Sequence, residues 1–135
     1  MADFPERILG MQPKIAVEGK KAFVVVDYTR FYIYNAETNQ WTRKTFPINY
    51  SRHYITAYYS QHGKVYALVS PGMSSETIFE YDIAADTWRN LGILRAQPSG
   101  NFYGFFIGNK HFIGGHKHDP FSTELFESDA SYLFK

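Results

Sequence analysis

Glycine-containing turn signals return at an almost constant interval along this chain. Gly19, Gly63 and Gly108 lie 44 and 45 residues apart. The first two are followed directly by lysine, and Gly108 is followed by Asn109 and Lys110. A short, mostly apolar run comes after each of them, which suits a tight hairpin that leads into a buried strand. A period of this length limits the chain to folds that are assembled from copies of one small unit.

A second landmark trails each glycine. It is an aromatic residue with a polar neighbour, followed by a second aromatic residue six or seven positions after the first. The three copies are Tyr34-Asn35 with Trp41, Tyr81-Asp82 with Trp88, and Phe126-Glu127 with Tyr132. The two tryptophans are the only ones in the chain and are 47 residues apart. Two landmarks that recur together indicate three tandem copies that fill nearly the whole sequence.

Each copy divides into four short strands. In the second copy we expect strands at residues 54–60, 64–69, 77–82 and 87–91. The first copy follows the same plan from about residue 14 to 46, and the third runs from 102 to 135. Aromatic residues make up 19% of the chain and favour pleated sheets, while no stretch shows sustained helical periodicity. The sequence therefore predicts one all-β domain with antiparallel repeats at 11–47, 51–92 and 99–135, after an N-terminal extension of residues 1–10.

Several of the repeated residues follow a pattern found in a known family. They are Gly63-Lys64-Val65-Tyr66, Tyr81-Asp82, Trp88 and the paired glycines Gly114-Gly115. This pattern resembles the kelch repeat, although the first two copies have Val26-Asp27 and Val69-Ser70 in place of paired glycines. The resemblance implies three four-stranded β-propeller blades. The repeat positions are expected to have structural roles: Gly19, Gly63, Gly108, Tyr34, Tyr81, Trp41, Trp88, Gly114 and Gly115. For Trp41 and Trp88, core packing is favoured over ligand stacking.

Three blades do not make a ring, because propellers close with about 4–8 blades. A stack of three would leave two apolar sheet faces open, and an open apolar patch favours association. A homodimer of three plus three blades, a partner chain that supplies the missing blades, and a fragment of a longer protein remain open as solutions. The alternative fold is an up-and-down β-barrel, which has no physical reason to repeat the tyrosine and tryptophan landmark.

The expected function is protein–protein interaction, because kelch domains usually bind a protein or peptide through loops at one end of the ring. By resemblance these loops are residues 27–30, 70–75, 115–122, 43–52 and 90–101. Arginine and tyrosine are frequent at interface hot spots. The residues expected to bind a partner are Arg30, Tyr50, Arg52, His53 and Arg95. The alternative for each of them is an ordinary loop residue.

Enzyme chemistry finds little support in the sequence. The absence of cysteine excludes disulfides, thiol catalysis and the tyrosine–cysteine site of galactose oxidase-type propellers. No nucleophile elbow, phosphate loop or sialidase box occurs. His116, His118 and Asp119 could offer a metal two imidazoles and a carboxylate, but a solvated loop is the favoured interpretation. Glu80 and Asp82 are expected at hairpins or on the surface. We expect no enzyme and no cofactor, with a propeller-based lectin or metal-dependent enzyme as the alternative function.

Charge and hydropathy point away from nucleic acids and membranes. The formal net charge is +1 at pH 7, and the lysines and arginines are scattered. No apolar run reaches the length of a membrane span, and residues 2–7 do not resemble a signal peptide. We therefore expect a soluble, cytoplasmic protein.

Overall fold

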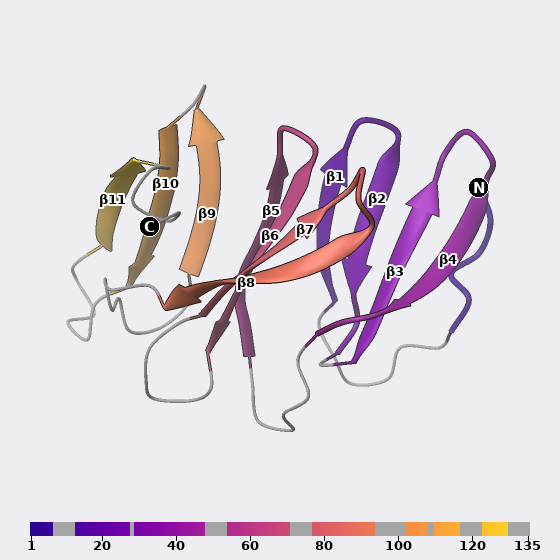
Figure 1. Ribbon diagram of the computed structural model, residues 1–135, viewed down its shortest axis with the longest axis horizontal. Helices are drawn as coiled ribbons and strands as arrows, with labels where there is room; N and C mark the ends of the chain where they lie inside the picture. The colour runs from indigo at the N-terminus through magenta and orange to yellow at the C-terminus, as the bar shows by residue number, and fades with distance from the viewer. Residues whose placement is uncertain are drawn as a thin grey trace.

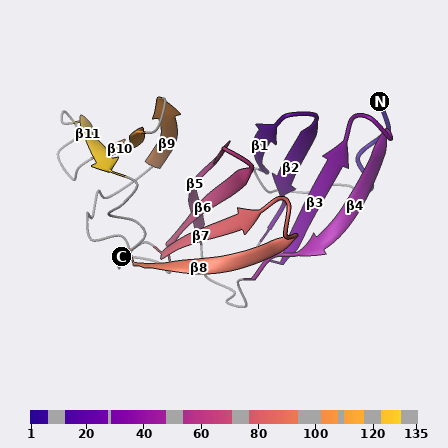
Figure 2. The same cartoon turned by 45° about the horizontal axis from the view of Figure 1, so that its top comes forward.

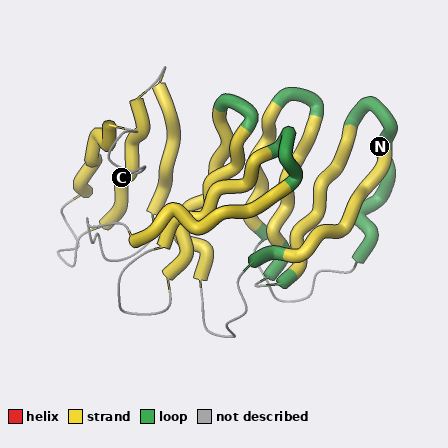
Figure 3. Tube along the Cα trace, in the orientation of Figure 1, coloured by secondary structure: helices red, strands yellow, loops and turns green. Residues whose placement is uncertain are grey.

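Strands and turns account for all the regular structure that the computed structural model describes. It describes residues 1–6, 13–27, 29–47, 54–70, 77–93, 102–107, 110–116 and 123–129. Within these ranges there is no helix (Figure 3). The described strands form three antiparallel sheets, so the prediction of an all-β fold is confirmed.

Each sheet is a meander built from one third of the chain. Sheet 1 contains β1 (Lys14–Glu18), β2 (Lys21–Val25), β3 (Arg30–Asn35) and β4 (Gln40–Thr45), paired in that order. Sheet 2 contains β5 (Tyr54–Gln61), β6 (Lys64–Ser70), β7 (Thr77–Asp82) and β8 (Thr87–Ile93), also in order. Sheet 3 contains β9 (Phe102–Ile107), β10 (Lys110–His116) and β11 (Thr123–Asp129), in the order β11-β10-β9.

The three sheets are separate, because no ladder among the described strands joins one sheet to another. An up-and-down barrel requires one continuous sheet that closes on itself. The described strands do not form such a sheet, so that alternative is wrong for this part of the chain. The fourth strand expected in the third copy falls on residues 130–135, which lie outside the described residues.

The first strands of the three sheets lie next to one another, with β1 against β5 and β5 against β9. Figures 1 and 2 show the three sheets side by side in chain order, with sheet 2 between sheets 1 and 3. Hydrogen bonds join sheets 1 and 2 here. The Ser60 hydroxyl donates to the Val17 carbonyl at 2.7 Å, and the Gly63 amide donates to Glu18 Oε1 at 3.0 Å.

The two-residue turns explain the glycine repeat and correct its alignment. Lys21 pairs with Glu18 and Lys64 pairs with Gln61, so these lysines are equivalent in register. Gly19, with φ of 58°, is therefore the first residue of its turn, whereas Gly63, with φ of 74°, is the second. The glycine-to-glycine alignment of the first two copies is thus shifted by one residue relative to the strands.

The four-residue turns that follow β3 and β7 are copies of one another. Asn39 and Asp86 end them in the left-handed region, at φ of 54° and 56°. Short polar side chains tolerate this conformation better than most residues. The Tyr34 and Tyr81 hydroxyls donate hydrogen bonds to the side-chain carboxamide and carboxylate of these two residues. The repeated tyrosine thus stabilises the turn that follows its own strand.

The main core lies between sheets 1 and 2. We call the face of sheet 1 that points toward sheet 2 its forward face, and the opposite face its back face. In sheets 2 and 3, the forward and back faces are those that carry the residues equivalent in register to the forward and back residues of sheet 1. The back face of sheet 2 therefore points toward sheet 1. Phe31 is 0% exposed and meets Tyr81 and Trp88 at ring-centroid distances of 5.2 and 5.3 Å. The buried residues of this core are Ala16, Phe23, Val25, Phe31, Phe46, Val65, Ala67, Val69 and Tyr81. Strand alternation places them on facing sides of the two sheets.

The part of the chain that the structure describes contains no helix with the length and apolar character of a membrane span.

Candidate interaction surface

The back face of sheet 1 combines a covered half with an open half. Its side chains alternate with those of the forward face along each strand. They are Ile15 and Val17 on β1, Val24 on β2, Val26 just after it, Tyr32 and Tyr34 on β3, and Trp41 and Arg43 on β4. This face looks away from sheet 2, and residues 1–6 lie over its outer part, beside β4 (Figure 1).

Phe4 covers the aromatic part of this face. Its ring centroid lies 5.1 Å from that of Tyr32 and 4.8 Å from that of Trp41, with interplanar angles of 65° and 82°. Edge-to-face geometry of this kind is favourable beyond the area that it buries. Val24, Val26 and Tyr32 are consequently buried and form a small core with Phe4 and Trp41.

Backbone groups of the same segment are bound as well. The Ala2 nitrogen donates to Asn39 Oδ1 at 2.6 Å, and the Trp41 indole Nε1–H donates to the Ala2 carbonyl at 3.2 Å. The buried end of Trp41 thus obtains the hydrogen bond that an amphipathic ring requires. Residues 1–6 are therefore held by polar contacts as well as by the Phe4 ring.

Glu6 completes the contact through charge. Its carboxylate accepts hydrogen bonds from the Arg30 guanidinium and the Tyr32 hydroxyl, and Arg43 Nη1 lies 3.6 Å away. Arg30 also donates from Nε to Asp27 at 2.5 Å. The pKa of Arg30 is raised, first by the hydrogen bond to Asp27 and then by the hydrogen bond to Glu6. The Arg30 guanidinium donates hydrogen bonds to both Asp27 and Glu6, so its orientation is fixed. It therefore holds the Glu6 carboxylate in one position as well as attracting its charge.

Asp27 is kept ionised by its own turn. Partial burial opposes its charge, but hydrogen bonds from the backbone and side chain of Thr29 and Arg30 lower the pKa of Asp27 below its ordinary value. The Asp27 carboxylate orients the Arg30 guanidinium, and Arg30 in turn binds Glu6. Asp27 thus supports the Glu6 contact indirectly.

The half of the back face nearest β5 is uncovered. Ile15 and Val17 on β1 are 59% and 62% exposed although they lie on the same face as buried Val24. The equivalent positions of sheet 2 are Tyr58 and Ser60, and they contact sheet 1. Ile15 and Val17 thus form an exposed apolar strip at positions that are partly buried against a neighbouring sheet in the second copy.

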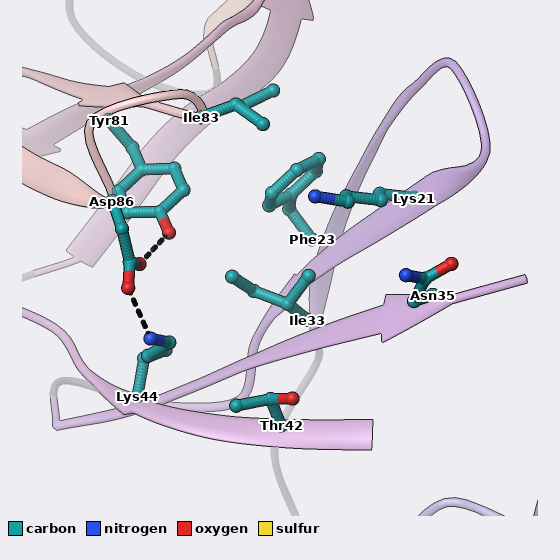
Figure 4. A pocket seen from close by; sticks show the side chains of 9 residues that line it. All are labelled: Lys21, Phe23, Ile33, Asn35, Thr42, Lys44, Tyr81, Ile83 and Asp86. Atoms are coloured by element: carbon teal, nitrogen blue, oxygen red, sulfur yellow. Dashed lines mark hydrogen bonds and ion pairs between the residues drawn. The ribbon is translucent and has the colours of Figure 1, made fainter. Parts of the chain in front are cut away.

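A cleft of about 270 Å³ lies between the forward face of sheet 1 and the end of β7 with its following turn in sheet 2 (Figure 4). Its lining residues are Lys21, Phe23, Ile33, Asn35, Thr42, Lys44, Tyr81, Ile83 and Asp86. Lys44 Nζ lies 2.5 Å from Asp86 Oδ2, and the Tyr81 hydroxyl donates to the same carboxylate. The hydrogen bond from Lys44 lowers the pKa of Asp86, whereas burial raises the pKa of Tyr81. Neither group is poised to exchange a proton near neutral pH, so the pair acts as a structural tie.

Glu80 corrects an expectation from the sequence. It is 1% exposed and lies on the forward face of sheet 2, not at a hairpin or on the surface. Its carboxylate accepts a hydrogen bond from Arg89 Nε at 2.8 Å, and Lys64 Nζ lies 3.8 Å away. Burial, and next the charge of Glu80, raise the pKa of Tyr66. A buried carboxylate with cationic partners is a stable arrangement only while those partners remain.

The residues expected to bind a partner fall largely outside the described ranges. Tyr50, Arg52, His53 and Arg95 lie there, as do the metal candidates His118 and Asp119 and the repeat position Gly108. Arg30 is described and begins β3. His116 ends β10, where only the backbone is described. Among the described residues no group of three histidine, aspartate or glutamate side chains could hold a metal ion.

The remaining repeat positions lie at equivalent places in the sheets. Tyr34 pairs with Trp41 across β3 and β4, as Tyr81 pairs with Trp88 across β7 and β8. The two tyrosine and tryptophan pairs have nearly the same geometry, at 4.9 Å and 41° in sheet 1 and 5.1 Å and 43° in sheet 2. Gly114-Gly115 lies within β10, opposite Leu125 and Glu124 of β11.

Sequence reasoning did not identify residues 1–6 as part of the site. A signal was present, because Phe4-Pro5 recurs as Phe46-Pro47, 42 residues later and directly after β4. Phe4-Pro5 precedes the first glycine landmark, so the repeat pattern places it in the N-terminal extension rather than in a repeat. The sequence matches no protein-family model and no curated protein.

Proposed function

We propose that this chain is a kelch-like interaction module that supplies three blades of a β-propeller. In this arrangement β1, β5 and β9 face the axis, and the outer strands lie away from it. The contacts between β1 and β5 and between β5 and β9 support the proposal, as does the strict meander of sheets 1 and 2. Propellers are built by this kind of radial repetition of four-stranded sheets.

The observation that carries the proposal is the exposure of Ile15 and Val17. Each sheet-to-sheet contact of a propeller joins a forward face to a back face, as sheets 1 and 2 do here. The back face of sheet 1 has no sheet against it among the described residues, and its innermost strand exposes these two apolar side chains. Burying a valine or isoleucine contributes about 1.5–3 kcal/mol, so leaving both in water favours association.

The opposite end of the described stack has a matching feature. Phe105 and Ile107 on β9 are 37% and 63% exposed. By register Phe105 is equivalent to Tyr59, and it stacks on Phe112 at 5.4 Å as Tyr59 stacks on Tyr66 at 5.6 Å. This is the forward face of sheet 3, which is the face that receives a following sheet.

We infer that a second copy covers both ends. The forward face of sheet 3 in one copy would meet the back face of sheet 1 in the other, and a two-fold axis would repeat the contact. The product has six blades, within the range of about 4–8 that close into rings. No further protein is then needed to bury the apolar ends, and the loops on one rim of the ring are free to bind a partner protein or peptide.

Sedimentation equilibrium of the purified chain tests this proposal. We expect a mass of twice the 15.6 kDa of the chain, with no larger species. A closed dimer ends growth, whereas open stacking would give a series of masses that increases with concentration. A mass of 15.6 kDa that persists at high protein concentration contradicts closure by a second copy, and leaves a different chain as the source of the missing blades.

A further inference from the structure

Two Phe-Pro pairs in this chain contact two equivalent tryptophans in the same way. The Phe4 ring meets Trp41 at 4.8 Å and 82°, and the Phe46 ring meets Trp88 at 4.8 Å and 80°. Phe46 follows β4 and reaches from sheet 1 to the back face of sheet 2. On sheet 2 this place is taken by Phe46, which follows the outer strand of the preceding sheet. Phe4 takes the equivalent place on sheet 1.

The equivalence extends two residues upstream of each phenylalanine. Ala2 donates its backbone nitrogen to the side chain of Asn39, and Lys44 donates its ammonium to the side chain of Asp86. Asn39 and Asp86 are the matching left-handed residues of the four-residue turns. Residues 2–4 thus reproduce the contacts of residues 44–46, although one set uses the backbone and the other a side chain.

The residue two positions after each phenylalanine differs between the copies, and so does the surface offered to it. Glu6 follows Phe4-Pro5, whereas Ile48 follows Phe46-Pro47. Sheet 1 surrounds the Glu6 carboxylate with the polar side chains Arg30, Tyr32 and Arg43. In register, sheet 2 has Thr77, Phe79 and Asn90 at these positions, and none of the three carries a charge.

We infer that the outer part of the back face of sheet 1 is a recognition site for a segment that carries phenylalanine, proline and then an acidic residue. The site consists of Tyr32 and Trp41 for the aromatic ring, Arg30 and Arg43 for the carboxylate, and Asn39 for the backbone nitrogen. Residues 1–6 fill this site in the same molecule. The occupant that the site fits is therefore the Phe-Pro-Glu segment of residues 4–6, here supplied by the same chain.

This inference does not depend on ring closure. The recognition site lies over β3 and β4, whereas the open apolar strip lies on β1. A tethered segment competes at an effective concentration of the order of millimolar, so a free peptide has to be tested on a chain whose own segment is weakened. Phe4→Ala combined with Glu6→Gln removes the ring and the charge and leaves every residue of the sheet intact.

The experiment uses full-length protein with this double substitution and follows the two indole N–H resonances during titration with an acetylated and amidated peptide Ala-Asp-Phe-Pro-Glu-Arg. Trp41 reports on the site because its indole donates to Ala2. Trp88, in the core between sheets 1 and 2, is an internal control. We expect the peptide to shift the Trp41 signal alone, and to bind the unsubstituted protein at least tenfold more weakly.

Two matched peptides test the recognition itself. Replacing the phenylalanine by alanine should abolish the Trp41 shift, and replacing the glutamate by isoleucine should weaken binding at least fivefold. In a receptor that also carries Arg30→Thr, Tyr32→Phe and Arg43→Asn, which copies sheet 2 at these three positions, this preference for glutamate should be lost. Equal binding of the glutamate and isoleucine peptides to the Phe4→Ala/Glu6→Gln protein, or no Trp41 shift at all, would overturn the inference.

A measurement within one molecule keeps the test decisive if the double variant does not fold. Glu6→Ile alone should accelerate hydrogen exchange of the Trp41 indole several-fold relative to that of Trp88. Arg30→Thr combined with Tyr32→Phe and Arg43→Asn should restore slow exchange in the Glu6→Ile chain. Unchanged exchange after Glu6→Ile would show that the carboxylate contributes nothing to the site.

Discussion

The Lys44 ammonium on β4 lies 2.5 Å from the Asp86 carboxylate in the turn after β7, and so joins the outer ends of sheets 1 and 2. The two first strands are joined at the other side of the stack by the hydrogen bonds of Ser60 and Gly63. The sheets are thus fastened at both edges of a shared aromatic core. The relative position of the two sheets is therefore fixed by polar contacts in addition to burial.

The Asp86 contact makes part of the stability depend on pH. The pKa of Asp86 is lowered in the folded state, chiefly by Lys44, so its contribution is present above the ordinary carboxylate pKa and is lost as pH falls through the folded-state pKa. We expect Asp86→Asn to lower the free energy of unfolding by about 0.5–1 kcal/mol at pH 7, because both side chains are partly exposed. The difference from the unsubstituted protein should disappear at a pH below both pKa values.

Asparagine is the suitable replacement because Asp86 has φ of 56°. Alanine would add backbone strain to the loss of charge. Urea unfolding of the single variants and of Lys44→Met/Asp86→Asn gives the coupling energy directly. Coupling that is absent at low salt as well as at high salt would show that the ion pair contributes nothing.

Phe31 is the residue on which the contact between sheets 1 and 2 depends most. It is 0% exposed and touches Phe23, Tyr81 and Trp88. Phe31→Ala should cost about 3–5 kcal/mol, because it removes a large buried ring and leaves a cavity. Ile93→Ala is the control, since Ile93 is 65% exposed and its truncation should change stability by less than about 0.5 kcal/mol. Chemical denaturation followed by tryptophan fluorescence measures both, and equal effects would contradict the central packing role of Phe31.

Much of the fold followed from period and alternation. The repeated tyrosine and tryptophan located β3, β4, β7 and β8 correctly, because cross-strand aromatic pairs need the same spacing in every copy. The glycine landmark was less accurate. A two-residue turn accepts glycine at either position, so Gly19 and Gly63 mark equivalent hairpins with a shift of one residue.

The site was harder to predict because its members are distant in sequence. Glu6 and Arg43 approach each other only when residues 1–6 lie over β4, and no local pattern connects them. Burial of Glu80 was missed for a related reason. A charged residue on an amphipathic strand is normally assigned to water, and the partner that permits its burial, Arg89, belongs to the next strand.

The turn between β5 and β6 offers a gain in stability. His62 and Gly63 have φ of 51° and 74°, so both central residues are left-handed, as in a type I′ turn. Asn-Gly is the preferred sequence for that turn, and His62→Asn should therefore stabilise the protein by about 0.5 kcal/mol. Gly63→Ala should destabilise it by about 1–2 kcal/mol through strain alone, because a Cβ there would meet no atom within 4 Å. Thermal unfolding ranks the two variants, and a loss of stability in His62→Asn would contradict this turn geometry.

Val17 provides the sharpest test of the proposed association. It is 62% exposed on the first strand of sheet 1, so Val17→Lys should leave the fold of the single chain nearly unchanged. In a closed dimer the same side chain would lie against a second copy, where an unpaired ammonium costs several kcal/mol. We expect the mass in solution to fall from twice the chain mass to the 15.6 kDa of one chain, with little change in circular dichroism. Ile93→Lys is the matched control, because Ile93 is similarly exposed, at 65%, but lies on the outer strand β8, away from the first strands. If both substitutions dissociate the protein, or neither does, β1 is not the strand through which two copies meet.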